Sequence, residues 1–240
     1  MSTSHPSTSS SRRSKSWGSD LRAGAGPLLL VVALLAVAVP VGAAAPTLDE
    51  AVQRLETTYQ GLRDLKAEFR QAAFNRTLNQ TTEAKGTLYL KKPGKLRWEY
   101  TTPTPQEIVS DGQKLWVYTP ELKQVNVTAA PQALAGPAGS FLQGLGQVRE
   151  QFEVRFLNPA QPTDADGNVV LNLTPKNPQP LLARLVLSVD QRSGLVQKAV
   201  LYDELGNEVR LAFLDVAVNP GLSDKLFVFT PPPGAVVVGN

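Results

Sequence analysis

The hydrophobic and polar positions of the chain change their period near residue 63. Across residues 48–59 the large apolar side chains recur at three- and four-residue spacing, which is typical of an amphipathic helix. Thr47 and Glu50 occupy the two positions of a capping box, so the helix is expected to begin directly after Thr47. Gly61 stands where a left-handed residue often ends a helix. From Leu65 onward apolar and polar residues alternate, and this period of two predicts β-strands.

Turn signals divide the longest alternating stretch, residues 86–125. A Pro-Gly pair at 93–94 and an Asp-Gly pair at 111–112 each supply a residue that readily adopts φ > 0 between two β-rich runs. Further alternating runs between residues 152 and 218 bring the total to about eleven short strands. The fold class is therefore mainly β with α. We expect a single curled antiparallel sheet that forms an incomplete, half-open β-barrel and is covered by the N-terminal helix.

The segment at about 129–146 interrupts the strands with a run rich in Ala, Gly and Pro. Gly and Pro cost about 1 and 3 kcal/mol in a helix interior, so any helices here are short and weakly stable. We expect this segment to be a loose helical lid over the sheet.

The apolar positions of a curled sheet and its covering helices face one another. The expected walls of the interior are Leu88, Leu90, Leu96, Trp98, Ile108, Leu115, Val117, Phe152, Val154 and Phe156. The expected lid side chains are Leu55, Tyr59, Leu134, Phe141, Leu142 and Leu145. Alternation cannot distinguish a hollow interior from a filled core, so residues alone leave both readings open.

The first 45 residues differ from the rest of the chain. A Ser/Thr-rich stretch with basic residues precedes an apolar run at about 27–41 and then a group of small residues. This order is typical of a secretory signal that is cleaved, and the alternative is a membrane anchor. We expect residues 1–45 to be a cleaved signal peptide and residues 46–240 to form one exported domain.

Removal of this leader changes the charge balance and the available chemistry. It carries four of the 24 Lys and Arg residues and one of the 21 Asp and Glu residues, which leaves 20 of each. A net charge near zero removes the main support for nucleic-acid binding. The single His and the single Met also lie in the leader, and there is no Cys. This composition excludes Ser-His-Asp and Cys-His catalysis and imidazole or thiolate metal sites, so we expect no enzyme, metal or cofactor.

Three segments carry a resemblance to a known family. They are Lys-Lys-Pro-Gly-Lys-Leu-Arg-Trp-Glu-Tyr at 91–100, Val-Ser-Asp-Gly-Gln-Lys-Leu-Trp-Val-Tyr-Thr-Pro at 109–120 and Phe-Val-Phe-Thr-Pro-Pro-Pro-Gly-Ala-Val at 227–236. Together they resemble the LolA family of periplasmic outer-membrane lipoprotein carriers. The resemblance implies a monomeric chaperone that holds acylated lipoproteins in its apolar interior. It also implies two partners: an inner-membrane ABC-type releasing complex and an outer-membrane lipoprotein acceptor.

The resemblance also assigns roles to residues near the first turn. Lys92 stands where the family usually has an arginine that holds the lid to the sheet, and Arg97 is a second candidate for this latch. Leu96 matches an apolar position at the mouth of the interior. Without the resemblance, Lys92 reads as a solvated turn lysine and Leu96 as an ordinary core residue of a strand.

Two other functions remain open at this stage. One is a periplasmic signalling module of the same fold that senses lipoproteins. The other is a structural β-domain with a filled core. An outer-membrane acceptor of the same fold would need an acylated Cys, which the sequence lacks.

Overall fold

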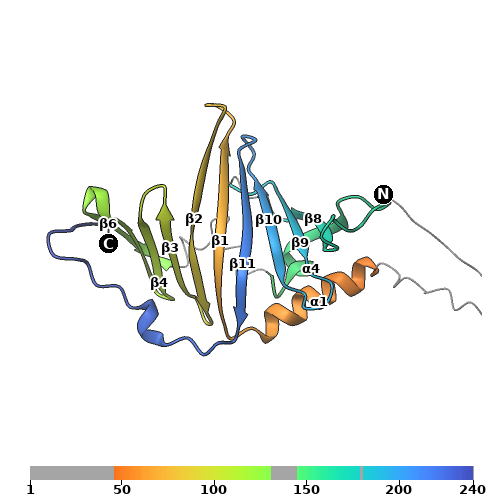
Figure 1. Ribbon diagram of the computed structural model, residues 1–240, viewed down its shortest axis with the longest axis horizontal. Coiled ribbons are helices and arrows are strands. Elements are labelled where there is room, and N and C mark those ends of the chain that lie inside the picture. The colour runs from red at the N-terminus through yellow and green to blue at the C-terminus, as the bar shows by residue number, and fades with distance from the viewer. Residues whose placement is uncertain (1–45, 131–144, 179–180, 240) are drawn as a thin grey trace, which may run out of the picture. The chain divides into compact units, whose positions relative to one another are not determined.

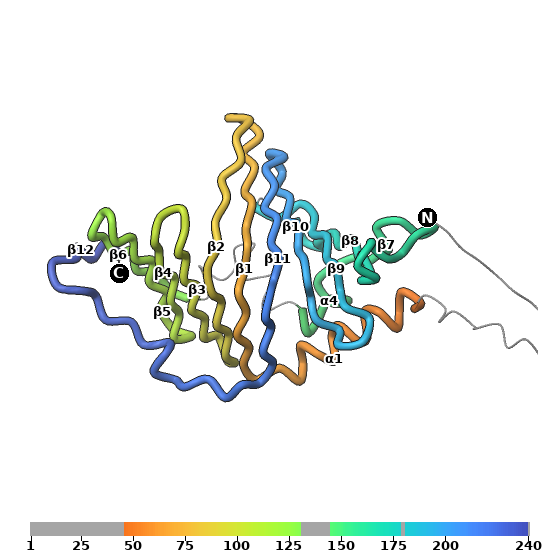
Figure 2. The backbone as a smooth tube through the Cα atoms, in the orientation of Figure 1, coloured from red at the N-terminus to blue at the C-terminus, as the bar shows by residue number. Residues whose placement is uncertain are grey.

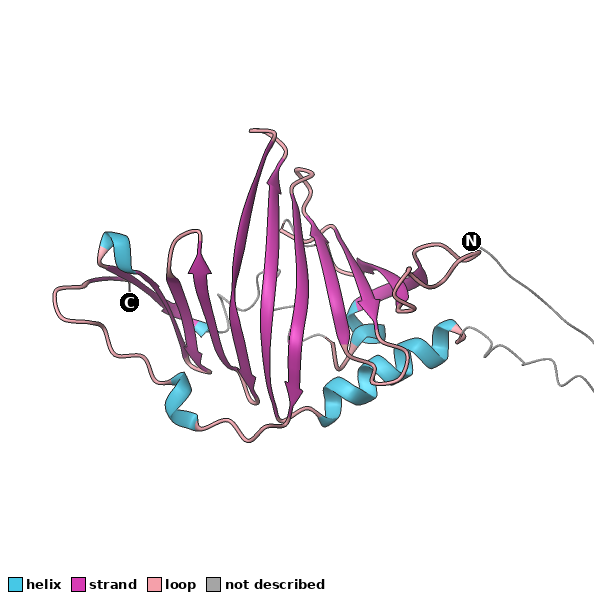
Figure 3. Cartoon of the chain, in the orientation of Figure 1, coloured by secondary structure: helices cyan, strands magenta, loops and turns pink. Residues whose placement is uncertain are grey.

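The computed structural model describes residues 46–130, 145–178 and 181–239 of the protein (Figure 1). Within these residues the chain forms one sheet and a few helices (Figure 3). The helices are α1 (Leu48–Gly61), η1 (Pro120–Leu122), α4 (Val148–Gln151) and η2 (Asp224–Phe227), where η marks a 3-10 helix. The strands are β1 (Asp64–Asn75), β2 (Gln80–Lys91), β3 (Lys95–Thr102), β4 (Gln106–Asp111), β5 (Lys114–Thr119), β6 (Gln124–Ala129), β7 (Phe152–Phe156), β8 (Val169–Pro175), β9 (Arg184–Val189), β10 (Val196–Tyr202), β11 (Glu208–Val218) and β12 (Val236–Val238).

The strands lie in the order β12-β6-β5-β4-β3-β2-β1-β11-β10-β9-β8-β7 in one open, curled sheet. Every neighbouring pair is antiparallel except β12, which runs parallel to β6. The prediction of a single antiparallel sheet is therefore confirmed for eleven strands. The twelfth strand was not predicted, because three consecutive valines are too short to show an alternating pattern.

The register of the strands defines two faces of the sheet. Leu88 lies opposite Trp98, which in turn lies opposite Ile108 on the next strand. Side chains that face each other across neighbouring strands lie on the same side. We call this side the inner face, and the side that carries Arg97 and Val109 the outer face.

The predicted capping box at the start of α1 is confirmed. The Glu50 N–H donates to the Thr47 hydroxyl at 3.3 Å, and the Thr47 N–H donates to the Glu50 carboxylate at 2.8 Å. The hydrogen bond from the Thr47 backbone lowers the pKa of Glu50. These bonds satisfy two backbone donors at the helix N-terminus, where no partner within the helix exists.

Loss of this cap gives a first testable result. Thr47→Ala is expected to lower the free energy of unfolding by about 1 kcal/mol. The matched control is Thr57→Ala at an exposed position inside α1, which is expected to be neutral or slightly stabilising because Ala is the better helix former. Urea denaturation of both variants measures the difference. Equal changes in the two variants would contradict the role of the cap.

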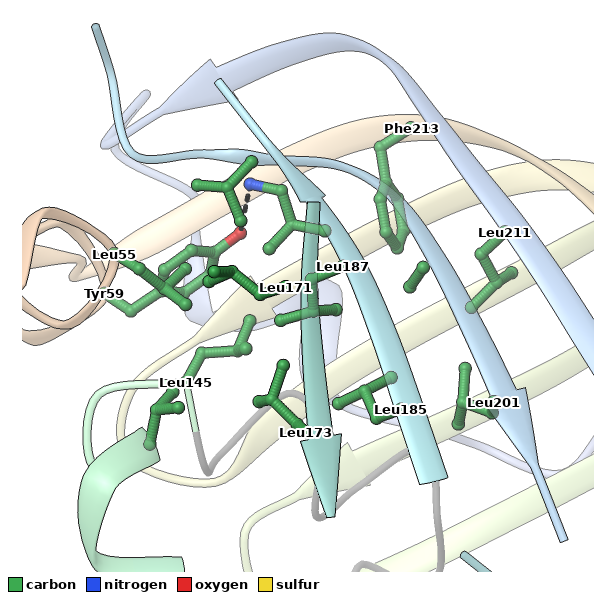
Figure 4. Close-up of a cluster of buried hydrophobic side chains, with 14 of the residues drawn as sticks. Leu55, Tyr59, Leu145, Leu171, Leu173, Leu185, Leu187, Leu201, Leu211 and Phe213 are labelled. Carbon is green, nitrogen blue, oxygen red and sulfur yellow. Dashed lines mark hydrogen bonds between the residues drawn. The ribbon is translucent and has the colours of Figure 1, made fainter. Parts of the chain in front are cut away.

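The apolar side of α1 packs on the inner face. Ala51, Val52, Leu55 and Tyr59 are its buried residues, and all belong to the main hydrophobic core. Figure 4 shows leucines of β8 and β9 pointing toward Leu55 and Tyr59, with Leu145 beside them. This part of the inner face is therefore a filled core.

The turn between β9 and β10 fixes the position of α1. The Thr58 hydroxyl donates to the Ser193 carbonyl at 2.7 Å. Gly194 follows with φ +69°, and a Cβ on this residue would lie 2.7 Å from the Arg54 carbonyl oxygen. Only glycine allows this backbone conformation and this close approach of helix and turn.

A long segment after β11 follows the outer face. We call residues 219–235 the strap; it leads from the end of β11 to β12 at the edge of the sheet (Figure 2). Within it the Phe227 side chain is 1% exposed, and η2 contacts β3 and β4. The ring of Phe229 lies 6.1 Å from that of Trp116 and 6.0 Å from that of Tyr118. The strap therefore covers apolar side chains that the outer face would otherwise expose.

Hydrogen bonds hold the start of the strap to β1. The Asp64 carboxylate accepts from the N–H groups of Gly221 at 2.9 Å and Leu222 at 3.2 Å. In return the Asn219 side-chain oxygen accepts from the backbone of Arg63 at 2.7 Å. Asp64 is only 6% exposed, so these bonds supply the partners that a buried carboxylate needs. None of the helices in the described ranges is long and apolar enough to span a membrane.

Candidate functional site

The structure brings the predicted wall residues together on the inner face. Leu88, Leu96, Trp98, Leu115 and Phe152 are buried. Leu90, Ile108, Val154 and Phe156 are partly buried and pack against the core. Val117 is half-buried and lies opposite Ile108 in the register. Two rows cross the strands β2 to β5, one from Leu88 through Trp98 to Val117 and the other from Leu90 through Leu96 to Leu115.

These residues fall into two groups along the sheet. The three from β7 lie at one end, where Val154 faces Leu173 and Phe156 faces Leu171 in the filled core under α1. The seven from β2 to β5 lie on the other side of β1 and β11. The two groups therefore belong to different parts of the inner face, which the alternation of residues alone did not reveal.

A cavity of about 350 Å³ lies on the inner face. Its lining comes from β3 and β4 on one side and from β10 and β11 on the other, although these strands are far apart in the order of the sheet. These two sets of strands can line the same cavity because the sheet curls and brings their inner faces toward each other. The lining residues are Gln71, Trp98, Tyr100, Ile108, Leu181, Leu201, Tyr202, Asp203, Asn207, Val209 and Leu211.

The sequence predicted only two residues of this lining, Trp98 and Ile108. The β10 and β11 side of the cavity, with Leu201, Val209 and Leu211, was predicted as strands but not as part of the site. These strands alternate as clearly as the others. What the sequence could not show is which strands face each other across the curled sheet.

A second, much smaller space lies where α1 meets the sheet. It measures about 20 Å³, and Tyr59, Leu88, Leu90 and Phe213 contribute to its lining. A space of this size is large enough for about one water molecule and too small for a ligand chain. The contact between the end of α1 and the sheet is therefore nearly closed.

Two aromatic rings of the larger cavity's wall, Trp98 and Tyr100, pack against Phe69. The Phe69 ring meets Trp98 and Tyr100 edge to face, each with centroids 5.1 Å apart, and Trp98 stacks on Tyr100 at 6.2 Å. The Tyr100 hydroxyl donates to the Gln71 side-chain oxygen at 3.2 Å. Burial raises the pKa of Tyr100 to about 12, so its hydroxyl stays protonated at neutral pH.

Lys92 connects the sheet to the end of α1. Its Nζ donates to the carbonyl oxygens of Tyr59 at 2.5 Å and Gln60 at 3.4 Å. Burial lowers the pKa of Lys92. Its backbone N–H donates to the Arg63 carbonyl at 2.8 Å, which holds the residue beside the helix end. The predicted contact of Lys92 with helix backbone is thus present, and it is made with α1.

The Lys92 contact also explains an error in the predicted helix end. Gly61 was expected to adopt a left-handed conformation, but it is the last helical residue, and Leu62 follows with φ −72°. A left-handed residue normally serves to satisfy the last carbonyl groups of a helix. Here the Lys92 amine binds two of those carbonyls instead.

Arg97 does not take part in this contact. It lies on the outer face, where its guanidinium donates to the Glu99 carboxylate, to Glu107 at 2.8 Å and to the Leu226 carbonyl of the strap at 3.3 Å. Odd and even residues of a strand face opposite sides, so Arg97 cannot share the side of Leu96 and Trp98. Of the two latch candidates, only Lys92 therefore reaches α1, whereas Arg97 binds the 3-10 helix η2 in the strap.

The predicted lid residues are described in part. Leu55 is fully buried, Tyr59 is 7% exposed and Leu145 is 2% exposed, all within the main core. The Val196 N–H donates to the Tyr59 hydroxyl at 3.3 Å, and burial raises the pKa of Tyr59 to about 12. The remaining three, Leu134, Phe141 and Leu142, lie outside the described residues, as does the leader at 1–45.

Comparisons with known proteins give a consistent result. The family profile described as "Outer membrane lipoprotein carrier protein LolA" matches residues 60–230, which is more than half of the chain. A protein of Dechloromonas aromatica named outer-membrane lipoprotein carrier protein is 34% identical over 79% of this chain and 88% of its own length. A protein of Pseudomonas aeruginosa with the same name is 33% identical over 87% of this chain and 98% of its own length.

Among solved structures, an uncharacterized conserved protein from Thermus thermophilus has a similar fold. The TM-score is 0.50 with 15% sequence identity, and the match covers 79% of this chain and 97% of that protein. At this identity the similarity concerns the fold alone.

Proposed function

The chain belongs to the LolA family of outer membrane lipoprotein carrier proteins, and we propose that it binds the acyl chains of lipoproteins against the inner face of its sheet. Its function is that of a periplasmic lipoprotein carrier. The observation that carries the binding proposal is the cavity of about 350 Å³, lined mainly by apolar side chains of β3, β4, β10 and β11. Its size lies within the range of roughly 300–1,000 Å³ that is common for ligand pockets.

The energetics of acyl binding favour partial burial. Each buried CH₂ contributes about 0.8 kcal/mol, so a chain of roughly a dozen methylenes gains about 10 kcal/mol before any costs. A lipoprotein carries several chains, and deep burial of all of them would make release too slow for a carrier. We therefore propose that the cargo is held partly within the cavity and that it leaves when an acceptor binds it more strongly.

The direction of transport follows from the family. The protein would receive acylated lipoproteins from an inner-membrane ABC-type releasing complex and deliver them to an outer-membrane lipoprotein acceptor. Residues 1–45 would direct the chain to the periplasm and then be removed. Family membership favours this carrier over a signalling module, and the cavity argues against a structural domain with a filled core.

Lys92 is proposed to stabilise the closed position of α1. Lys92→Met keeps the length of the side chain and removes the hydrogen bonds to Tyr59 and Gln60. We expect amide hydrogen exchange in the last turn of α1 to become roughly tenfold faster, since a bond from a charged donor is lost. The control is Lys95→Met, which removes an exposed ion pair with Asp224 on the outer face. Unchanged exchange in Lys92→Met would contradict the latch role.

A depletion experiment in cells tests the transport proposal. When expression of the protein is switched off in its host, lipoproteins destined for the outer membrane should accumulate in the inner membrane. Re-expression of the unaltered chain should restore their location. Normal sorting after complete depletion would refute an essential carrier role.

A further inference from the structure

Trp98 carries a buried hydrogen-bond donor with no acceptor. Its side chain is on the inner face of β3, and the residue is 4% exposed. The indole Nε1 is shielded from solvent and has no hydrogen-bond partner in the described part of the chain. Its neighbours are instead the aromatic rings of Phe69 and Tyr100. Buried donors are almost always paired, so an unpaired one in a native structure calls for an explanation.

The cavity beside Trp98 supplies the place where an acceptor could bind. Trp98 lines it together with Gln71 and Tyr100. The Tyr100 hydroxyl already donates to the Gln71 side-chain oxygen, so that oxygen has a donor. The opposite wall contributes the hydrocarbon side chains of Leu201, Val209 and Leu211, and beside them Asp203 and Asn207, whose side chains are bonded to each other at 2.7 Å. Trp98 is thus a lining residue that carries an unused donor in a mostly apolar space, and a small number of polar groups orient ligands in apolar pockets.

We propose that the Trp98 Nε1–H donates a hydrogen bond to an acyl carbonyl oxygen of the cargo, which places the start of that acyl chain at the Trp98 wall. This inference rests on the proposed function, since it requires that acyl chains enter the cavity. A hydrocarbon chain has no acceptor of its own. The carbonyl group that joins it to the lipoprotein is the nearest acceptor that could pair with the indole.

The charges around the cavity select a neutral carbonyl over a free fatty acid. No Lys or Arg is among the described residues that line it, and Asp203 is acidic. A carboxylate in such a site would have neither a cationic partner nor full hydration. An ester or amide carbonyl carries no charge and needs only one donor. Trp98 would therefore help to distinguish acylated cargo from free fatty acids.

The test compares one substitution across a set of synthetic lipopeptides. Trp98→Phe removes the N–H and keeps a large aromatic ring, and Trp116→Phe makes the same change on the outer face beside Phe229 as a control. The probes are a triacylated lipopeptide with two ester-linked chains and one amide-linked chain, its diether analogue, and its analogue in which only the amide-linked chain is joined through an ether oxygen. The proteins are expressed as the full chain, and Kd is measured by displacement of an uncharged apolar fluorescent dye.

The expected result is a loss specific to one carbonyl. Trp98→Phe should bind the triacylated probe about tenfold more weakly than the unaltered protein and Trp116→Phe, as for loss of one buried hydrogen bond. The unaltered protein should bind the analogue that lacks this carbonyl about tenfold more weakly than it binds the triacylated probe. Trp98→Phe should bind that analogue and the triacylated probe with equal affinity. A loss with the diether identifies an ester carbonyl, and a loss with the analogue whose third chain is ether-linked identifies the amide carbonyl. Equal affinities of Trp98→Phe and the unaltered protein for every probe would overturn the inference.

A spectroscopic measurement covers the case in which the variant is poorly folded. In the unaltered protein, the indole N–H resonance of Trp98 should move downfield when the triacylated probe binds, while that of Trp116 stays in place. An unmoved Trp98 resonance in a protein that does bind the probe would refute the hydrogen bond and leave the carrier function intact. Failure of all three probes to bind would refute the proposed function itself.

Discussion

Replacing Ile108 by aspartate is expected to weaken the binding of a triacylated lipopeptide more than about 100-fold, which corresponds to about 2.7 kcal/mol. Ile108 lies on the inner face of β4 and lines the cavity of about 350 Å³. A carboxylate at this position must lose its hydration when an acyl chain enters. The effective cost of burying an unpaired ion is several kcal/mol, and the short aspartate side chain cannot extend to solvent around the ligand.

The same substitution on the outer face provides the control. Leu214 of β11 is 39% exposed and lies opposite Glu68 of β1. Leu214→Asp is expected to change lipopeptide affinity less than twofold, because its carboxylate stays hydrated whether or not ligand is bound. Ile108→Val, which removes one methylene, should also bind nearly normally. Displacement of an uncharged apolar fluorescent dye measures all three Kd values, and equal losses in the two aspartate variants would argue against the cavity as the binding site.

The second large effect concerns the strap. Phe227→Ala is expected to lower the free energy of unfolding by about 3–4 kcal/mol. The Phe227 side chain is 1% exposed, and the helix η2 to which it belongs contacts β3 and β4. Truncation to alanine leaves a cavity there, and it loosens a segment that also holds Phe229 against Trp116. Urea denaturation followed by tryptophan fluorescence reports both the stability and the environment of Trp116.

The neighbouring residue makes a matched control for this prediction. Val228 is 65% exposed, so Val228→Ala should change the free energy of unfolding by no more than about 0.5 kcal/mol. A loss below about 1 kcal/mol in Phe227→Ala would show that the strap does not contribute to the stability of the sheet. In that case the outer faces of β3 and β4 would have to tolerate exposure of Val109, which is fully buried in the structure.

The local elements of this fold could be predicted from sequence because local chemistry determines them. Thr47 and Glu50 cap α1 as expected. The glycines at 94 and 112 adopt positive φ in the two predicted turns, with values of +64° and +97°. Each of these features depends on residues within four positions of each other, so a short window of sequence contains the information.

The site was less predictable because it depends on contacts between distant strands. Trp98 and Ile108 were expected in the interior, but their partners across the cavity, Leu201 and Leu211, come from strands about 100 residues later in the sequence. Arg97 was named beside Lys92 as a latch candidate, and its parity on β3 places it with Val109 on the outer face. Register and curl, which the sequence does not state, decide such contacts.

The two parts of the inner face suit a carrier that must stay folded while its ligand enters and leaves. The filled core under α1, with Leu55 and Leu171 fully buried, stabilises the protein whether or not the cavity is occupied. The cavity lies beside this core and shares the sheet with it. Trp98, Leu201 and Leu211 line the cavity and belong to the same hydrophobic cluster, so a ligand would contact the edge of the core. The Lys92 contact is made at the end of α1, beside the small space between α1 and the sheet.

The most direct test of acyl-chain carriage is native mass spectrometry of the protein with a purified triacylated lipoprotein in mild detergent, beside the same lipoprotein without its acyl chains. Binding at the cavity predicts a one-to-one complex with the acylated form and none with the unacylated form. Ile108→Asp should abolish that complex. Binding of both forms, or of neither, would contradict the central claim that this protein carries lipoproteins by their acyl chains.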